Sequence, residues 1–219
     1  SDLPVARIVA AIDAAAARLA GDDDPTRQLA ERLLPDLTGY SPPMVRLVLE
    51  RMLLDWRADA LERLLAAEFP DPGVLDAFRP HPAGIPRTWV RALGAELALH
   101  VFSGNVPGVA VTSIIRSLLT KSAVIGKTAS GEPLLPVLFA RTLADIDPRL
   151  GDCLAILYWL GGSEEIEAAA CEAADLVVVY GGEDAVRQLR GRIPPDTRVV
   201  VHGPRFSIGL VGRDALTEE

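Results

Sequence analysis

Residues 100–136 read HVFSGNVPGVAVTSIIRSLLTKSAVIGKTASGEPLLP, and this stretch decides the fold. It contains a short apolar segment, a turn of small residues, an amphipathic segment with helical spacing, a second apolar segment ending at Lys127, and the start of another helix. A strand, a tight turn and a helix in this order present backbone N–H groups and a helix N-terminus to an anionic ligand such as a dinucleotide pyrophosphate. The stretch therefore predicts a nucleotide-binding α/β unit.

The same alternation of apolar strands and short helices continues towards the end of the chain. Strands are predicted at 98–102, 122–126, 153–159, 176–180 and 199–202, with a sixth at 207–211, and helices at 109–119, 133–144, 163–174 and 183–191. Short strands that are apolar on both faces and separated by helices are typical of a parallel sheet covered on both sides. We therefore predict an α/β fold with a Rossmann-like parallel sheet covered by helices.

The first third of the chain has apolar residues at helical spacing instead. Helices are predicted at 4–20, at 25–34, and from 41 to about 65 with room for one break. Proline and glycine become dense from Pro70 to Pro86, which marks an irregular connector. We predict a helical N-terminal region and connector over 1–92 and a Rossmann-like domain over 93–219. The helices either pack as a layer on the second domain or a partner, which we prefer because they show no polar cluster, or form a substrate-facing cap.

Composition excludes several classes of protein. A net charge of −8 and a pI near 5.0 argue against a nucleic-acid surface, which needs a basic footprint. Apolar runs are far shorter than the roughly 20 residues that cross a bilayer, and no signal peptide is recognisable. The two cysteines lack disulfide or zinc-site spacing, so a cytoplasmic protein without metal is expected. The missing initiator methionine and the ending at Glu219 suggest a fragment.

Ligands of such sheets bind outside the carboxyl ends of the strands. Small, glycine-rich or hydroxyl-bearing turns follow the predicted strands, as close approach by a phosphate or ribose requires. The candidate cofactor-binding residues in these turns are Ser103, Gly104, Val106, Pro107, Lys127, Ser130, Gly161, Gly162, Gly181 and Gly182, with Asn105 as the catalytic candidate. The G-x-G-x-x-G fingerprint and the G-x-x-x-x-G-K-[ST] phosphate loop are both absent.

Three segments carry a resemblance to a known family: SGNVPGV at 103–109, VVVYGGEDAVRQLR at 177–190 and VVVHGPRFSIGLV at 199–211. Over residues 95–213 the chain resembles the LuxC-type long-chain acyl-CoA reductases of the aldehyde dehydrogenase superfamily. The resemblance implies an aldehyde dehydrogenase-type cofactor domain and a two-step reaction. A cysteine thiolate takes the acyl group from the thioester, and hydride from a nicotinamide cofactor then gives an aldehyde.

The resemblance also implies roles for individual residues. Asn105 aligns with the superfamily asparagine that stabilises the oxyanion, although it could equally be a turn residue that caps the next helix. Lys127 aligns with the lysine that holds the adenosine ribose, against the alternative of a solvated lysine after an edge strand. Ser130 stands where NAD-preferring members often carry glutamate, which favours NADPH over NADH. Gly181 and Gly182 align with the turn beside the pyrophosphate, but Glu183 departs from the serine found there in many relatives.

Neither cysteine suits the nucleophile, because Cys153 opens a predicted core strand and Cys171 lies in an alanine-rich helix. The resemblance places the reactive cysteine in a domain that follows the cofactor domain, so this chain is expected to bind cofactor without turnover. An acyl-CoA or other acyl thioester is the expected substrate. Homo-oligomers and acyl-transferring or acid-activating partner enzymes are known among such proteins. The alternatives are a non-catalytic nucleotide-binding or scaffold module, and a reductase of another activated acyl group.

Overall fold

The computed structural model describes residues 3–203 and 208–212. Its N-terminal part consists of four helices, α1 (Val5–Ala20), α2 (Pro25–Thr38), α3 (Pro42–Asp55) and α4 (Ala58–Glu68). Side-chain caps start two of them: Asp24 accepts the N–H groups of Thr26 and Arg27, and Ser41 accepts that of Met44. Helix α2 runs four residues past its predicted end, through Pro35, and stops where Gly39 adopts a φ of 74°.

The long helix expected from residue 41 is divided between α3 and α4. Asp13 of α1 stabilises the start of the second helix, because its carboxylate accepts the N–H of Ala58 at 2.9 Å and the Nε–H of Arg57 at 2.6 Å. The break itself lies at Trp56 and Arg57.

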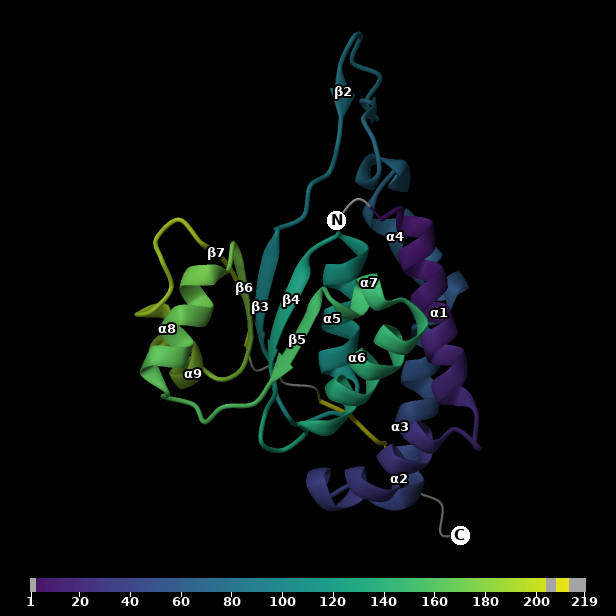
Figure 1. Ribbon diagram of the computed structural model, residues 1–219, viewed down its shortest axis with the longest axis vertical. Helices are drawn as coiled ribbons and strands as arrows, with labels where there is room; N and C mark the ends of the chain where they lie inside the picture. Colours follow the sequence, from purple (N-terminus) through teal and green to yellow (C-terminus); the bar gives the residue numbers. More distant parts are fainter. Residues whose placement is uncertain (1–2, 204–207, 213–219) are drawn as a thin grey trace.

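The connector contains more structure than its proline content suggested. After the short helix η1 (Pro72–Leu75), strand β1 (Arg79–Pro80) pairs antiparallel with β2 (Trp89–Val90), and the two form an arm that projects from the body of the molecule (Figure 1). The predicted irregular connector is therefore a helical turn followed by a small hairpin.

The main sheet has five parallel strands in the order β5-β4-β3-β6-β7. Their bounds are Leu97–Val101 for β3, Ala123–Lys127 for β4, Leu154–Leu157 for β5, Leu176–Tyr180 for β6 and Arg198–His202 for β7. The chain runs from β3 outward to β5 and then returns to place β6 on the other side of β3. The strand order therefore reverses between β3 and β6, and the carboxyl ends of these two strands mark the expected ligand crevice.

Helices cover both faces of this sheet (Figure 1). Helices α5 (Val109–Leu119), α6 (Leu134–Ile146) and α7 (Pro148–Gly151) lie on one face, while α8 (Glu164–Ala173) and α9 (Glu183–Arg190) lie on the other. This confirms the predicted fold class.

Three details of the predicted sheet and its helices differ from the structure. Strand β5 is three residues shorter than expected, and α7 was not foreseen. The sixth strand was wrong for the described residues 208–212, which form no strand; Ser207 lies outside the described residues. Edge strand β7 is exposed along its length, so it lacks the complete covering that its valines suggested.

The N-terminal helices share one hydrophobic core with α5 and α6. Trp56 is 1% exposed; its ring packs edge-on against Phe139 at 5.6 Å and its indole N–H donates to Thr112 Oγ1 at 3.0 Å. The helices therefore pack as a layer on the rest of the chain, as in the interpretation that we preferred. The division at residues 92 and 93 stays a prediction. Over the described ranges, every helix is too short or too polar to cross a bilayer.

Candidate functional site

Asn105 lies in the loop between β3 and α5, at the carboxyl edge of the sheet. The Ser103 hydroxyl donates to Asn105 Oδ1 at 2.8 Å, and the Tyr40 hydroxyl donates to the Asn105 carbonyl oxygen at 3.1 Å. The first bond orients the side-chain amide and the second fixes the backbone of the loop. Within the described residues Asn105 Nδ2 has no acceptor, so this exposed amide can donate to a ligand.

This loop packs tightly against residues 128–132, which follow β4. A Cβ atom on Gly104 would lie 3.0 Å from both Glu132 N and Ala129 Cβ, so the close approach requires glycine at this position. Gly108 adopts a φ of 89° and lies beneath Met52 of α3. Pro107 is also buried, and Val106 is partly buried, so contact of these two residues with a cofactor stays a prediction.

Glu132 is a buried carboxylate beneath the Asn105 loop and was not among the predicted site residues. Its Oε1 accepts the N–H groups of Leu134 at 3.0 Å and Leu135 at 2.7 Å, so it caps α6. Burial raises the pKa of Glu132 to about 7, although the two N–H groups oppose the shift. The sequence did carry a signal for this capping role, because Glu132 directly precedes Pro133. Asp24 directly precedes Pro25 in the same way and caps α2.

A buried polar chain lies between β3, β6 and α5. His100 Nε2 is 2.8 Å from Ser117 Oγ and Nδ1 is 2.8 Å from Ser113 Oγ, which in turn lies 2.9 Å from the Tyr180 hydroxyl. The Tyr180 ring stacks on His202 at 4.5 Å. Burial, with a smaller contribution from the charge of His202, lowers the pKa of His100 to about 4. This series of hydrogen bonds thus fixes the Tyr180 side chain at the end of β6, beside the point between β3 and β6 where the strand order reverses.

Lys127 ends β4 and faces a cavity of about 100 Å³ between the sheet and helices α8 and α9. Its Nζ lies 5.8 Å from the centre of the Trp159 ring and donates to the Thr128 carbonyl at 3.5 Å. Burial lowers the pKa of Lys127, and the nearby Glu167 carboxylate opposes this shift. Trp159 is 7% exposed, and across the described part of the chain its buried Nε1 has no hydrogen-bond acceptor.

The turn at Gly161 and Gly162 closes one side of this cavity. Gly162 adopts a φ of 88°, and its N–H donates to Glu167 Oε1 at 3.0 Å. The other carboxylate oxygen of Glu167 accepts a bond from Arg192. Both oxygens of this buried carboxylate are thus used in holding the turn, and Gly161 lines the cavity beside Lys127.

The remaining predicted residues lie elsewhere at this edge. Ser130 is exposed, and in the described structure it makes no hydrogen bond to the Lys127 side chain. Gly181 lines a second hollow of about 310 Å³ beside α9 and β7, and its N–H donates to the His202 carbonyl at 3.3 Å. Gly182 precedes α9, and no Cβ contact restricts it. Neither glycine has a positive φ, so their roles at the pyrophosphate stay predictions.

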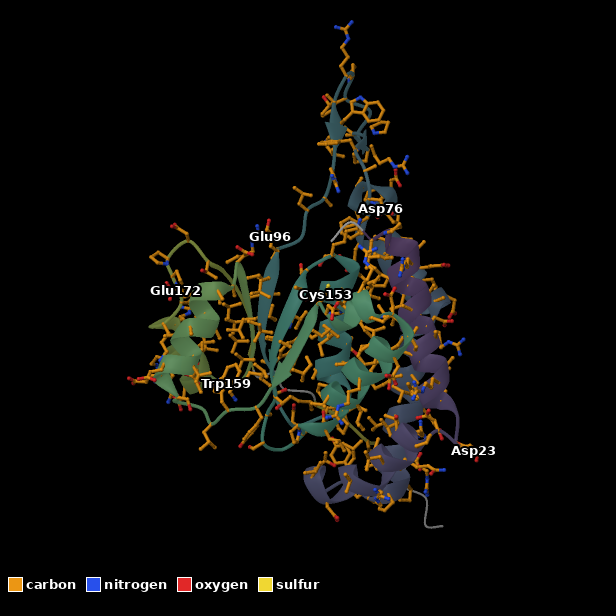
Figure 2. The ribbon with its side chains drawn as sticks, viewed as in Figure 1. Asp23, Asp76, Glu96, Cys153, Trp159 and Glu172 are labelled. Atoms are coloured by element: carbon orange, nitrogen blue, oxygen red, sulfur yellow. The ribbon has the colours of Figure 1, made fainter. Side chains whose placement is uncertain are left out.

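The two cysteines lie away from Asn105. Cys153 directly precedes β5 and so lies at the amino edge of the sheet, opposite Trp159 (Figure 2). Cys171 is fully buried in α8. Burial is the main cause that raises the pKa of each thiol, which disfavours the reactive thiolate.

The structure brings the Asn105 loop and Lys127 together through the sheet. Val101 pairs with Lys127, and the N–H of Phe102 donates to the Lys127 carbonyl at 3.0 Å. Sequence reasoning missed Tyr40, Glu132, Trp159 and Glu167. A lone tyrosine between two helices and a tryptophan in an apolar run carry no positional signal for a site.

Sequence comparison identifies relatives for the whole chain. The family model described as acyl-CoA reductase (LuxC) matches residues 1–219. The chain is similar to a long-chain acyl-protein thioester reductase of Photorhabdus luminescens, with 31% identity over 178 residues, which is 79% of this chain and 36% of the relative. It is 27% identical over 224 residues to the protein of that name from Vibrio harveyi, covering all of this chain and 46% of the relative. The chain therefore spans less than half the length of these curated relatives.

Solved structures agree on the fold. An NADP-dependent glyceraldehyde-3-phosphate dehydrogenase from Bacillus halodurans, complexed with NADP, superposes with a TM-score of 0.65 and 17% identity, over 91% of this chain and 40% of that one. A betaine aldehyde dehydrogenase from Staphylococcus aureus, in complex with NAD+, gives a TM-score of 0.68 and 17% identity, over 93% and 39%. At this identity the likeness shows an aldehyde dehydrogenase-type fold alone. Because the family model matches residues 1–219, the chain belongs to the acyl-CoA reductase (LuxC) family.

Proposed function

We propose that this chain is the cofactor-binding portion of a reductase that converts a long-chain acyl thioester to an aldehyde with NADPH. The observation that carries the proposal is the arrangement at the carboxyl edge of the sheet, where an oriented amide and a donor-lined cavity follow adjacent strands. Asn105 lies in the loop after β3, and Lys127 ends β4. The names of the relatives supply the acyl thioester, and those of two solved structures supply a nicotinamide cofactor.

The residues present fit a phosphorylated nicotinamide dinucleotide. The buried Trp159 Nε1–H finds no acceptor among residues 3–203 and 208–212, and Lys127 lines the same cavity. A ligand with ribose hydroxyls and phosphate oxygens supplies the acceptors that these donors lack. When bound, the cofactor supplies the hydride that reduces the acyl group.

Asn105 is proposed to stabilise the charge that develops on the carbonyl oxygen of the acyl group. Ser103 holds Oδ1, so the amide presents Nδ2 outward as the donor. A preorganised donor of this kind contributes on the order of 3 kcal/mol to an oxyanion. The hydrogen bond from the Tyr40 hydroxyl holds the backbone of the loop at Asn105.

The thiol that forms the acyl-enzyme is proposed to be neither Cys153 nor Cys171. Their raised pKa values and their positions keep both thiols from Asn105. We therefore expect the 219-residue chain to bind NADPH and to form no aldehyde from an acyl thioester.

Calorimetric titration of the chain with NADPH and NADH tests the proposal, together with an aldehyde assay on long-chain acyl-CoA. Saturable binding with preference for NADPH and no aldehyde is the expected result. Absence of binding to both cofactors would support a scaffold role, and aldehyde formation would disprove the assignment of the thiols.

A further inference from the structure

Two hydrogen-bond donors at the cavity beside Lys127, the Trp159 indole N–H and the Lys127 ammonium group, lack a strong acceptor among the described residues. Trp159 Nε1 is buried, and no acceptor reaches it from any residue described by the structure. Lys127 Nζ makes one long bond, of 3.5 Å to the Thr128 carbonyl, and has no salt bridge within the described ranges. Leaving a buried donor unpaired costs on the order of 1–3 kcal/mol. Such a pair of donors is explained by a ligand that brings acceptors.

Glu167, the carboxylate that lines the cavity, does not satisfy these donors. Its Oε1 accepts the Gly162 N–H and its other oxygen accepts from Arg192. The charge of Arg192 also offsets that of Glu167, which leaves the Lys127 charge in excess at the cavity. An anionic group is therefore favoured there over a neutral one.

The volume of the cavity restricts the size of the group that it holds. Its volume of about 100 Å³ is smaller than that of an engineered apolar cavity of about 150 Å³ that binds benzene. A phosphate group is of this scale, whereas a whole nucleotide is not. The apolar walls formed by Leu99, Val101 and Leu189 lower the local dielectric and strengthen the bonds of a charged guest.

We propose that Trp159 determines cofactor specificity, because its indole N–H and the Lys127 ammonium group together bind the phosphate on the adenosine ribose of NADPH. This inference rests on the proposed function and adds a residue to it. It also moves the basis of the preference for NADPH away from Ser130, which is exposed and does not line the cavity.

The test compares Trp159→Phe with the wild-type chain, because phenylalanine keeps an aromatic ring beside Lys127 and lacks the N–H donor. Phenylalanine is also smaller than tryptophan, so the comparison depends on the difference between two ligands and not on one affinity alone. Calorimetry measures binding of adenosine 2′,5′-bisphosphate and of 5′-AMP, which differ by the 2′-phosphate. We expect Trp159→Phe to weaken the bisphosphate about tenfold, as for loss of one hydrogen bond to a charged group, and to leave 5′-AMP within about twofold. The matched control is Trp89→Phe, at an exposed tryptophan of strand β2 in the arm, and it is expected to change the affinity for neither ligand.

An independent measurement needs no variant at the site. The indole N–H resonance of Trp159 in the wild-type chain is expected to shift with the bisphosphate and not with 5′-AMP. Equal loss of both ligands in Trp159→Phe, or an indole resonance that ignores the bisphosphate, would overturn the inference and leave the proposed function standing. Failure of the wild-type chain to bind NADPH or NADH would overturn both.

Discussion

The hydroxyl of Tyr40 donates a hydrogen bond to the carbonyl oxygen of Asn105 at 3.1 Å, across 65 positions of sequence. Tyr40 lies between α2 and α3, so the N-terminal helices contact the loop that carries the proposed oxyanion donor. These helices therefore do more than cover α5 and α6, because they fix one residue of the candidate site.

Tyr40→Phe is expected to loosen this loop without unfolding the chain. A partly exposed hydrogen bond contributes about 1 kcal/mol, so the free energy of unfolding changes little. Amide hydrogen exchange at residues 103–107 is expected to quicken, and NADPH affinity to fall a few-fold. Tyr158→Phe is the control, since the Tyr158 hydroxyl makes no hydrogen bond in the described structure. Unchanged exchange in Tyr40→Phe would mean that Gly104 and Glu132 hold the loop without Tyr40.

Asn105→Ala is expected to lower kcat by about 10²- to 10³-fold. The measurement uses a catalytically active reductase that includes these 219 residues. Affinity for NADPH is expected to stay within twofold, because the proposed role of the amide is to donate to the acyl carbonyl and not to the cofactor phosphates. Steady-state kinetics and calorimetry measure the two effects separately. Ser103→Ala keeps the amide and loses only its orientation, so its effect is expected to be smaller. An unaltered kcat in Asn105→Ala would assign Asn105 to the turn alone.

Glu132 is expected to make stability fall as pH rises towards neutrality. Its pKa is about 7 in the fold against an ordinary value of 4.5, so the folded chain retains a proton that the unfolded chain has released. The stabilising effect of this proton is complete below about pH 4.5 and disappears as pH passes 7, at a cost on the order of 3 kcal/mol.

Glu132→Gln is expected to remove this dependence, since its neutral amide oxygen can still accept the two N–H groups. Urea unfolding at pH 5 and pH 8 measures it, with Glu68→Gln at the exposed end of α4 as the control. Equal pH dependence in Glu132→Gln and the wild type would show that Glu132 does not titrate in this range.

His100 is expected to act in the opposite direction. Its pKa is about 4 in the fold against 6.5 ordinarily, so the unfolded chain binds a proton that the folded chain excludes. Stability is therefore lost as pH falls from about 6.5 to about 4. His100→Gln is expected to reduce the change in the free energy of unfolding between pH 7 and pH 5, whatever its effect on absolute stability. Urea unfolding at the two pH values measures this change. His81→Gln, in the connector, is the control, and an equal change in both variants would contradict the assignment.

Local sequence signals predicted most of the fold because they depend on neighbouring residues. Helix α5 and strand β6 have the predicted bounds, since capping and β-branched runs act over a few positions. The break before α4 depends on Asp13, 45 positions away, and could not be placed from the helix sequence itself.

The candidate site divides in the same way. Asn105 and Lys127 follow strand ends, so the α/β pattern located them. The sequence did not indicate Trp159, because a tryptophan in an apolar run is ordinarily interpreted as a core residue. Its proposed role depends on the lack of a hydrogen-bond acceptor for Nε1 among the described residues, which only the three-dimensional structure shows.

The shared core of α1 to α6 has a consequence for gene design and for evolution. A deletion that removes α1–α4 would strip the apolar covering from α5 and α6, and the exposed surface would favour aggregation. The α/β unit from β3 onward is therefore not expected to fold when it is separated from the N-terminal helices. A chimaera that takes its α/β unit from a relative therefore needs the N-terminal helices of the same relative. Otherwise the residues of α1–α4 that face α5 and α6 have to be changed to fit the new helices.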